Sequence, residues 1–564
     1  MKRIFLFTLA LQATLCAMAV PALRIRFQAT QKDGSTVAVT LHGDENLHYY
    51  LTDDAQPVLQ AEDGSFYHAT TDVLGLMRPS SVLAHDADSR GDIENQFLSL
   101  RGDGQELIGT AMRKTRAATS DIRRARPSQP IAGERKGLVI LVEYADVKFA
   151  RDNVQAYYDR LLNGEGAPEN DVHASVNRYF LDQSNGLFNL TFDVVGPVTM
   201  SNNRSYYGAN DIYGNDQRAE YMVEEACRMV NPDVDFSTYD WDQDGTVEQV
   251  FVVYAGHGEA GGGGKDCVWP HAYYVRNLTL DGVKVSQYAC SCELYGDKGT
   301  IPDGIGTFCH EFSHCLGLAD LYKTKGGSVY GFSVWSLMDW GCYCGKNMRG
   351  ETPVNYTSFE RYFCGWDTPV TLVSPCRVED MASLSEGGQS YIIYNDARKS
   401  EVYMLENRQL IGWDKHIYGH GLLILHVDYD ESVWESNTVN NNVNHQRCTI
   451  FLADNNEDFS VPSIQGDVYP GTSGNTSLTD TSVPAAHLLN AGPDGRYYMG
   501  KPIEDITESD NGRISFTFCG GTNAIHEVKV DSRSDGQWYD LNGTPVDKPA
   551  RGVYVRNGKK ILVK

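Results

Sequence analysis

The feature that most constrains this chain is a pair of histidines four residues apart, His310 and His314. In a helix this spacing puts both imidazoles on one face, close enough to share one metal ion. Glu311 follows the first histidine and can reach a water molecule on that metal without binding the metal itself. Gly317 can take the left-handed conformation that ends a helix, so that Asp320 can return as a third ligand. The stretch therefore predicts a helix, a tight turn and a zinc site whose fourth position is open.

Two histidines and a carboxylate with an open position are typical of a catalytic zinc site. Zinc would lower the pKa of a bound water to about 7, and Glu311 would act as the general base that takes its proton. We therefore expect a zinc-dependent endopeptidase. Two alternatives remain open: a binding protein that keeps a peptidase fold and has no use for Glu311, and a metal-dependent hydrolase of a non-peptide amide or ester.

The start of the chain has the three parts of a signal peptide. Lys2 and Arg3 are basic, an apolar run covers 4–16, and Ala17-Met18-Ala19 offers small residues for cleavage. We expect a signal peptide over 1–19 and a secreted or cell-surface protein. No later segment is apolar enough to span a membrane. The formal net charge of −25 makes nucleic acid an improbable partner.

A chain of 564 residues is too long for one compact core, so a multidomain α+β protein is expected. Within 20–126, a β-rich unit is predicted over residues 20 to about 112, with strands at Val37–Leu41, His48–Leu51 and Ser65–His68, and a basic linker completes the range. The linker contains a run of basic residues: Arg113, Lys114, Arg116, Arg123, Arg124 and Arg126. This run can be a solvated linker. It can at the same time be the site where an activating protease releases 20–126 as a propeptide, because the two interpretations are compatible.

Three more units follow. Alternating strands and helices over 134–368 predict the catalytic domain. Short strands and turns over 369–520 predict a β-sandwich-like domain, and 526–564 read as a small β module. This tail resembles the C-terminal sorting modules of some secreted Gram-negative proteins, which implies outer-membrane secretion machinery as a partner.

The chain resembles the immune inhibitor A family of secreted bacterial metallopeptidases, which are metzincin-like. The resemblance covers the motif from His310 to Asp320 and further blocks between about 137 and 520, among them Ser175–Phe180, Leu405–Gln409 and Gly466–Gly471. It implies zinc held by the two histidines and Asp320, protein or peptide substrates, and structural calcium. Met338 stands where metzincins have a methionine turn beneath the metal. Trp340 stands where some of them have a tyrosine, which leaves Tyr343 as a candidate to stabilise the oxyanion.

Acidic residues at alternate positions before Gly245 predict a calcium loop. Its candidate ligands are Asp240, Asp242, Asp244, Thr246 and Glu248. Phe251 at the twelfth position excludes a complete EF-hand. A plain acidic turn is the alternative.

The number of cysteines is, like the predicted signal peptide, consistent with an exported protein. Twelve cysteines follow Cys16, all from Cys227 onward. An even count in an exported chain predicts disulfides, up to six of them. A second metal site is less favoured, because the two close pairs, Cys290 with Cys292 and Cys342 with Cys344, have one intervening residue instead of two.

Overall fold

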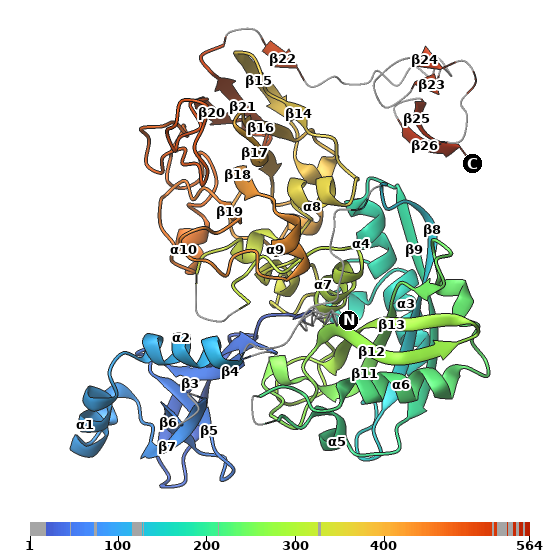
Figure 1. Ribbon diagram of the computed structural model, residues 1–564, viewed down its shortest axis with the longest axis vertical. Helices are drawn as coiled ribbons and strands as arrows, with labels where there is room; N and C mark the ends of the chain where they lie inside the picture. Colours follow the sequence, from blue (N-terminus) through green and yellow to red (C-terminus); the bar gives the residue numbers. More distant parts are fainter. Residues whose placement is uncertain are drawn as a thin grey trace, which may run out of the picture.

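The computed structural model describes residues 18–45, 47–72, 76–115, 127, 129–211, 214–324, 329–521, 524–526, 538–539, 545–546, 548, 552–556 and 559–563. Most of the predicted signal peptide (1–17) and linker residues 116–126 lie outside these ranges. The structure is a multi-sheet α+β protein, in which an N-terminal unit, a central pair of units and a tail follow one another along the chain (Figure 1).

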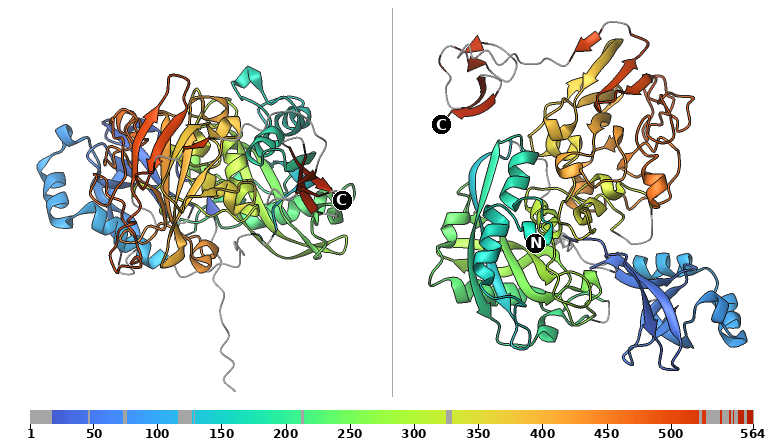
Figure 2. Two further views of the ribbon diagram at one scale, coloured as in Figure 1. Left: turned by 90° about the horizontal axis from the view of Figure 1, so that it is seen from above. Right: turned by 180° about the vertical axis from the view of Figure 1, so that it is seen from behind.

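The N-terminal unit is an antiparallel sheet whose six strands pair in chain order. They are β2 (Arg26–Thr30), β3 (Thr36–Asp44), β4 (Leu47–Thr52), β5 (Pro57–Gln60), β6 (Phe66–Thr71) and β7 (Met77–Leu83). The helices α1 (Asp92–Arg101) and α2 (Gly104–Thr115) follow. The three strands predicted from sequence are confirmed as β3, β4 and β6. The unit projects from the rest of the molecule in two views (Figures 1 and 2).

The central sheet is mixed, with the order β1-β12-β13-β11-β8-β9 and β10 beside β13. Its strands are β1 (Met18–Ala19), β8 (Gly133–Glu143), β9 (Phe188–Thr199), β10 (Thr246–Val247), β11 (Val250–His257), β12 (His271–Leu280) and β13 (Val283–Leu294). The strands β9, β8, β11 and β13 are parallel, and β12 and β1 complete one edge in antiparallel pairing.

Helices cover both faces of this sheet: α3 (Val154–Asn163), α4 (Val176–Gln183), α5 (Arg204–Gly208), α6 (Ala219–Val230) and α7 (Gly306–Cys315). Along β8, alternate residues enter two separate cores. Val139 and Leu141 lie in the core that contains α3, α4 and α7. Leu138 and Ile140 lie in the core that contains α6. The unbroken apolar run of β8 is therefore explained by burial on both sides, as in other parallel sheets.

Two more sheets follow the central one. One has the order β14-β16-β17-β18-β19, and the other β20-β21-β15-β22. Their strands are β14 (Val370–Thr371), β15 (Cys376–Met381), β16 (Tyr391–Asn395), β17 (Arg398–Arg408), β18 (Gly421–Asp428), β19 (Cys448–Ile450), β20 (Ile503–Glu508), β21 (Ile514–Phe518) and β22 (Ala524–His526). Short helices α8 (Ser358–Phe363), α9 (Glu431–Glu435) and α10 (Val461–Ile464) lie before or between them.

These sheets share one core with each other and a second core with the unit that contains the central sheet. Tyr403 and Leu405 of β17 pack with Phe516 of β21. Val402 and Met404, on the opposite face of β17, belong to the same core as α7. The unit after residue 368 is therefore packed onto the zinc-motif helix as well as onto itself.

The tail forms a small antiparallel sheet of β23 (Trp538–Tyr539), β24 (Pro545–Val546), β25 (Gly552–Arg556) and β26 (Lys559–Val563). The described part of the tail therefore has the β structure that its sequence predicts. Among the described residues, none of the helices has the length and apolar character needed to cross a membrane.

The predicted disulfides are wrong for this structure. All twelve cysteines from Cys227 onward are described, and none of them forms a disulfide. Nine of them are buried, where cysteine packs as a small apolar side chain. Burial raises the pKa of Cys227 to about 12 and that of Cys309 well above its ordinary value. An even count of cysteines gives no information on whether two of them meet, and here they fill separate positions in the cores.

Candidate metal centre and the cleft above it

The zinc motif folds locally as its spacing predicts. His310, Glu311 and His314 lie on α7, which ends at Cys315. Gly317 has a φ of +91°, and its N–H donates to the carbonyl of His314 at 3.0 Å. Only glycine takes this conformation without strain, and the resulting turn brings Asp320 back towards the helix.

The three predicted zinc ligands come together. Nε2 of His310 lies 3.1 Å from Oδ1 of Asp320, and Nε2 of His314 lies 3.5 Å from the same oxygen. One potential ligand atom from each residue lies within 4.8 Å of the other two, and all three side chains are buried. The two nitrogens and one carboxylate oxygen therefore surround a single point.

Hydrogen bonds on the outer side of each ring orient this cluster. Nδ1 of His310 lies 2.8 Å from the carbonyl of Leu337, and Nδ1 of His314 lies 2.8 Å from that of Leu318. A carbonyl only accepts, so each Nδ1 carries the proton and each Nε2 keeps its lone pair for a ligand. Neutral imidazoles held in this way, with an ionised carboxylate, are a donor set that fits zinc.

Asp320 is fixed by a residue that sequence reasoning missed. Asn437 donates from Nδ2 to Oδ2 of Asp320 at 2.5 Å and accepts from the backbone N–H of Asp320 at 2.8 Å. Burial favours the protonated carboxyl, but the two histidines in their protonated form and the hydrogen bond from Asn437 outweigh burial and lower the pKa of Asp320. Because Asn437 lies 117 residues further along the chain, no local pattern could have indicated it.

Met338 is fully buried at the turn that supports His310. The carbonyl of the preceding Leu337 holds the His310 ring, and the carbonyl of Met338 accepts from the N–H of Leu321 at 2.8 Å. From β17, Arg408 donates to the carbonyl of Trp335 at 2.8 Å. The methionine turn thus fixes the first ligand and the segment after the third.

Glu311 is fully buried on α7. Its Oε1 accepts the backbone N–H of Val20 at 2.8 Å, and its buried Oε2 has no hydrogen-bond partner among the described residues. Burial, and secondarily the charge of Asp320, raises the pKa of Glu311 well above its ordinary value, against the effect of Val20. The carboxylate can therefore exchange protons with a group at the position of the Val20 nitrogen.

The segment that begins at Met18 passes this site at Val20, whose N–H donates to Glu311. Met18 pairs with Ala272 as an antiparallel addition to β12. Nε1 of Trp269 then donates to the Val20 carbonyl at 3.0 Å. The hydroxyl of Tyr343 donates to the Pro21 carbonyl at 2.7 Å. Tyr343 thus contacts this segment one residue beyond Val20, which identifies it as a backbone anchor.

Three of the five predicted calcium ligands also come together. Carboxylate oxygens of Asp240, Asp242 and Asp244 lie within 4.8 Å of one another at the molecular surface. Glu248 is not part of this group, because its two oxygens accept the N–H of Trp241 at 2.9 and 2.7 Å. Thr246 follows in β10, and its N–H donates to Asp244 at 2.8 Å.

Comparison with known proteins agrees with this geometry. Residues 132–367 match the family model described as "Immune inhibitor A peptidase M6, catalytic domain". Immune inhibitor A of Bacillus thuringiensis subsp. alesti is 26% identical over 297 residues, which cover 45% of this chain and 42% of that protein. The pre-pro-metalloprotease PrtV of Vibrio cholerae is 26% identical over 251 residues, or 39% of this chain and 27% of that protein.

The matched part thus spans less than half the length of either relative. Residues 132–367, which the family model matches, contain all three clustered residues, Glu311 and the methionine turn. Residues 132–367 therefore form a catalytic domain of the immune inhibitor A family, the M6 peptidases.

Proposed function

We propose that this chain is a secreted zinc-dependent endopeptidase that is made as a latent precursor. The observation that carries the proposal is the cluster of His310, His314 and Asp320 with Glu311 beside it, next to a segment whose backbone pairs with β12 and donates to Glu311. A binding protein would not need a buried carboxylate next to the ligands. A hydrolase of small amides or esters would not need an edge strand that pairs with a peptide backbone.

Each residue has a task in this proposal. The two histidines and Asp320 would hold the ion, and Asn437 would hold Asp320. When bound, zinc supplies an acidic water and polarises the substrate carbonyl. Glu311 would take the proton from the attacking water and deliver it to the leaving amine, since its Oε1 lies 2.8 Å from a backbone nitrogen of that segment. Trp269 and Tyr343 would hold the carbonyls that follow that nitrogen.

Latency is supported by the position of the same N-terminal segment. Val20 and Pro21 are buried and bonded to Glu311 and Tyr343, so that a substrate cannot occupy this place at the same time. Signal-peptide removal after Ala19 would turn the Val20 nitrogen into an ammonium group beside Glu311, where an ion pair would strengthen the block. Cleavage in the basic run 113–126 by an activating protease would then allow 20–126 to leave.

The remaining proposals concern stability and export. A calcium ion at Asp240, Asp242 and Asp244 would neutralise three carboxylates in one loop. The predicted signal peptide and the tail sheet are the basis for proposing secretion, with the tail as a signal for outer-membrane secretion machinery.

The test compares casein digestion by the precursor and by trypsin-processed protein after the trypsin has been inhibited. Processed protein should digest casein, the precursor should not, and a zinc chelator should stop the digestion. Glu311→Gln should reduce the rate by about a thousandfold or more, because proton transfer and transition-state stabilisation are both lost. Glu169→Gln is the matched control, since Glu169 is a surface partner of Arg160. Full activity of Glu311→Gln, or no chelator-sensitive digestion by the processed protein, would refute the proposal.

A further inference from the structure

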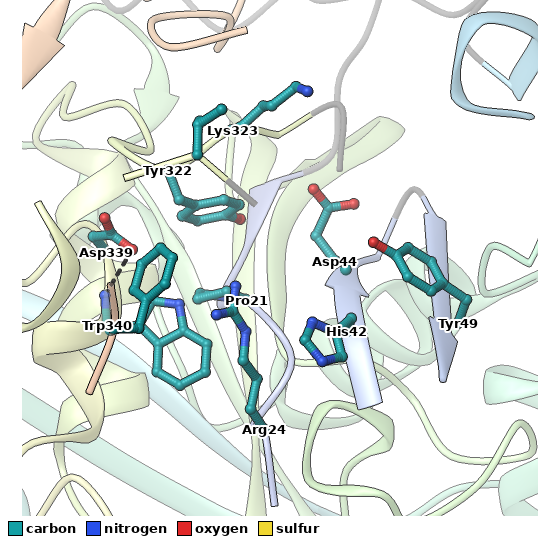
Figure 3. A pocket seen from close by; sticks show the side chains of 12 residues that line it. Pro21, Arg24, His42, Asp44, Tyr49, Tyr322, Lys323, Asp339 and Trp340 are labelled. Atoms are coloured by element: carbon teal, nitrogen blue, oxygen red, sulfur yellow. Dashed lines mark hydrogen bonds between the residues drawn. The ribbon is translucent and has the colours of Figure 1, made fainter. Parts of the chain in front are cut away.

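A side chain of the N-terminal segment occupies a pocket beside the metal centre. Arg24 places its guanidinium carbon 4.3 Å from the ring centre of Trp340 and 5.2 Å from that of Phe459. Asp339, buried next to Trp340, attracts the same guanidinium. Figure 3 shows Arg24 with Asp339 and Trp340 on one side and His42 and Tyr49 on the other.

The walls of this pocket have two origins. Residues such as His42, Asp44 and Tyr49 belong to the unit that the proposed activation would remove. The other wall, with Asp339, Trp340 and Phe459, belongs to the part that would remain. Lys323 also lines the pocket, but its ammonium group points away from Arg24 in Figure 3. After activation the remaining wall would keep the aromatic rings of Trp340 and Phe459 and the carboxylate of Asp339, which are the groups that recognise a cation.

The path of the segment relates Arg24 to the reaction. A general base in a peptidase delivers its proton to the amine that leaves. The nitrogen nearest Glu311 is that of Val20, so the Ala19–Val20 bond stands where a substrate's cleaved bond would stand. Arg24 is the fifth residue on the amine side of that bond. The backbone between them is held by Tyr343 at Pro21 and by the carbonyl of Ala260, which accepts the N–H of Leu23 at 2.9 Å.

From these contacts we infer that Asp339, Trp340 and Phe459 form a specificity pocket for an arginine or lysine about five residues beyond the cleaved bond. The inference rests on the proposed peptidase function and names the class of peptide that this site prefers. The propeptide would then block the enzyme by presenting the side chain that the pocket selects. Asp339 has a structural part as well, since it accepts the N–H groups of Phe332, Ser333 and Trp340.

The test uses processed protein and a peptide series with one cleavable bond. A single arginine is moved from the third to the seventh position on the amine side, in an otherwise neutral peptide, and the cleaved bond is identified by mass spectrometry. We expect kcat/KM to be highest with arginine at the fifth position, roughly tenfold above alanine there, with lysine close behind and neutral citrulline and glutamate near or below alanine. Equal rates for arginine, alanine and glutamate at every position would overturn the inference.

Variants locate the preference. Trp340→Leu and Phe459→Leu should each lower the arginine-to-alanine ratio of kcat/KM, while Tyr221→Leu, an exposed aromatic of α6, should leave the ratio unchanged. An unchanged ratio in both pocket variants would also overturn the inference. Chelator-sensitive cleavage of the alanine peptide separates this failure from failure of the peptidase proposal. If no peptide in the series is cleaved, the proposed function fails and the inference fails with it.

Discussion

Among the described residues, two clusters of possible metal ligands each bring three ligand atoms within 4.8 Å of one another but hold them in different ways. His310, His314 and Asp320 are buried, and two of them are fixed by residues distant in the chain: His310 by the carbonyl of Leu337 and Asp320 by Asn437. His314 is held by the carbonyl of Leu318 in the turn that follows it. Asp240, Asp242 and Asp244 lie in a surface loop and accept hydrogen bonds from N–H groups two to five residues away. The buried cluster is thus organised by the fold, whereas the loop is organised only by itself.

The residues that hold each cluster in place determine which role a bound ion can have. A cluster that the fold already holds in place can bind metal with little rearrangement and orient a reaction. The carboxylates of a surface loop repel one another, and a calcium ion bound among them would contribute to stability. Four predictions test whether the buried cluster and the surface loop have these different roles.

The largest effect is expected at a buried ligand. His314→Ala removes one of the three proposed zinc ligands, so metal content measured by mass spectrometry should fall to near zero. Peptidase activity should fall by about a thousandfold or more. His445→Ala is the control, because His445 pairs with Asp428 in another part of the fold. A variant that kept both metal and activity would show that the cluster is not the catalytic site.

A smaller effect is expected one contact further out. Asn437→Ala leaves all three ligands in place but removes the amide that orients Asp320. Zinc affinity, measured by competition with a chelator, should weaken by about 10- to 100-fold. Asn444→Ala, an exposed asparagine nearby in sequence, should leave it unchanged. Equal affinities for the two variants would mean that the fold does not organise the buried cluster through Asn437.

The loop should respond in stability and not in chemistry. Calcium at 10 mM should stabilise processed protein by about 1–3 kcal/mol if the loop binds as weakly as other extracellular calcium sites. Asp242→Asn should remove most of this gain in thermal unfolding, with zinc content unchanged. If Asp242→Asn kept the full gain, the calcium would bind elsewhere.

The smallest effect concerns pH in the absence of calcium. Burial, and then repulsion by Asp242 and Asp240, raises the pKa of Glu248 from 4.5 to about 7, against the opposing hydrogen bond from Trp241. An acid whose pKa is raised in the folded state costs stability once the unfolded chain releases its proton. Thermal stability in chelator should therefore decline as the pH rises from about 4.5 to 7, and Glu248→Gln should flatten this decline. An equal slope in the variant would exclude Glu248 as its source.

How much of the site could be predicted depended on distance along the chain. His310, His314, Gly317 and Asp320 lie within eleven residues, so helix periodicity and one glycine determine where they meet. Asn437 acts on Asp320 from 117 residues away, and Val20 reaches Glu311 across 291. Such contacts depend on tertiary packing, which no local pattern describes.

The same holds for the fold. β8 and β11 could be predicted because their apolar runs are buried on both faces. β12 was not predicted, because exposed and buried residues mix along it and its pairing shifts register between Tyr274 and Leu278. The cysteines show the opposite error, in which a correct count led to a wrong conclusion about bonding.

The core that joins β17 to α7 has a consequence for anyone who would excise the peptidase. A fragment ending at residue 367 would match the family model yet lack Asn437 and Arg408, which hold Asp320 and the carbonyl of Trp335. It would also expose the apolar face that Val402 and Met404 cover. Residues 132–367 are therefore not an independent structural unit, although the family model matches them alone. A fusion or truncation that exchanges the N-terminal unit or the tail should keep the central-sheet unit and the unit after residue 368 together.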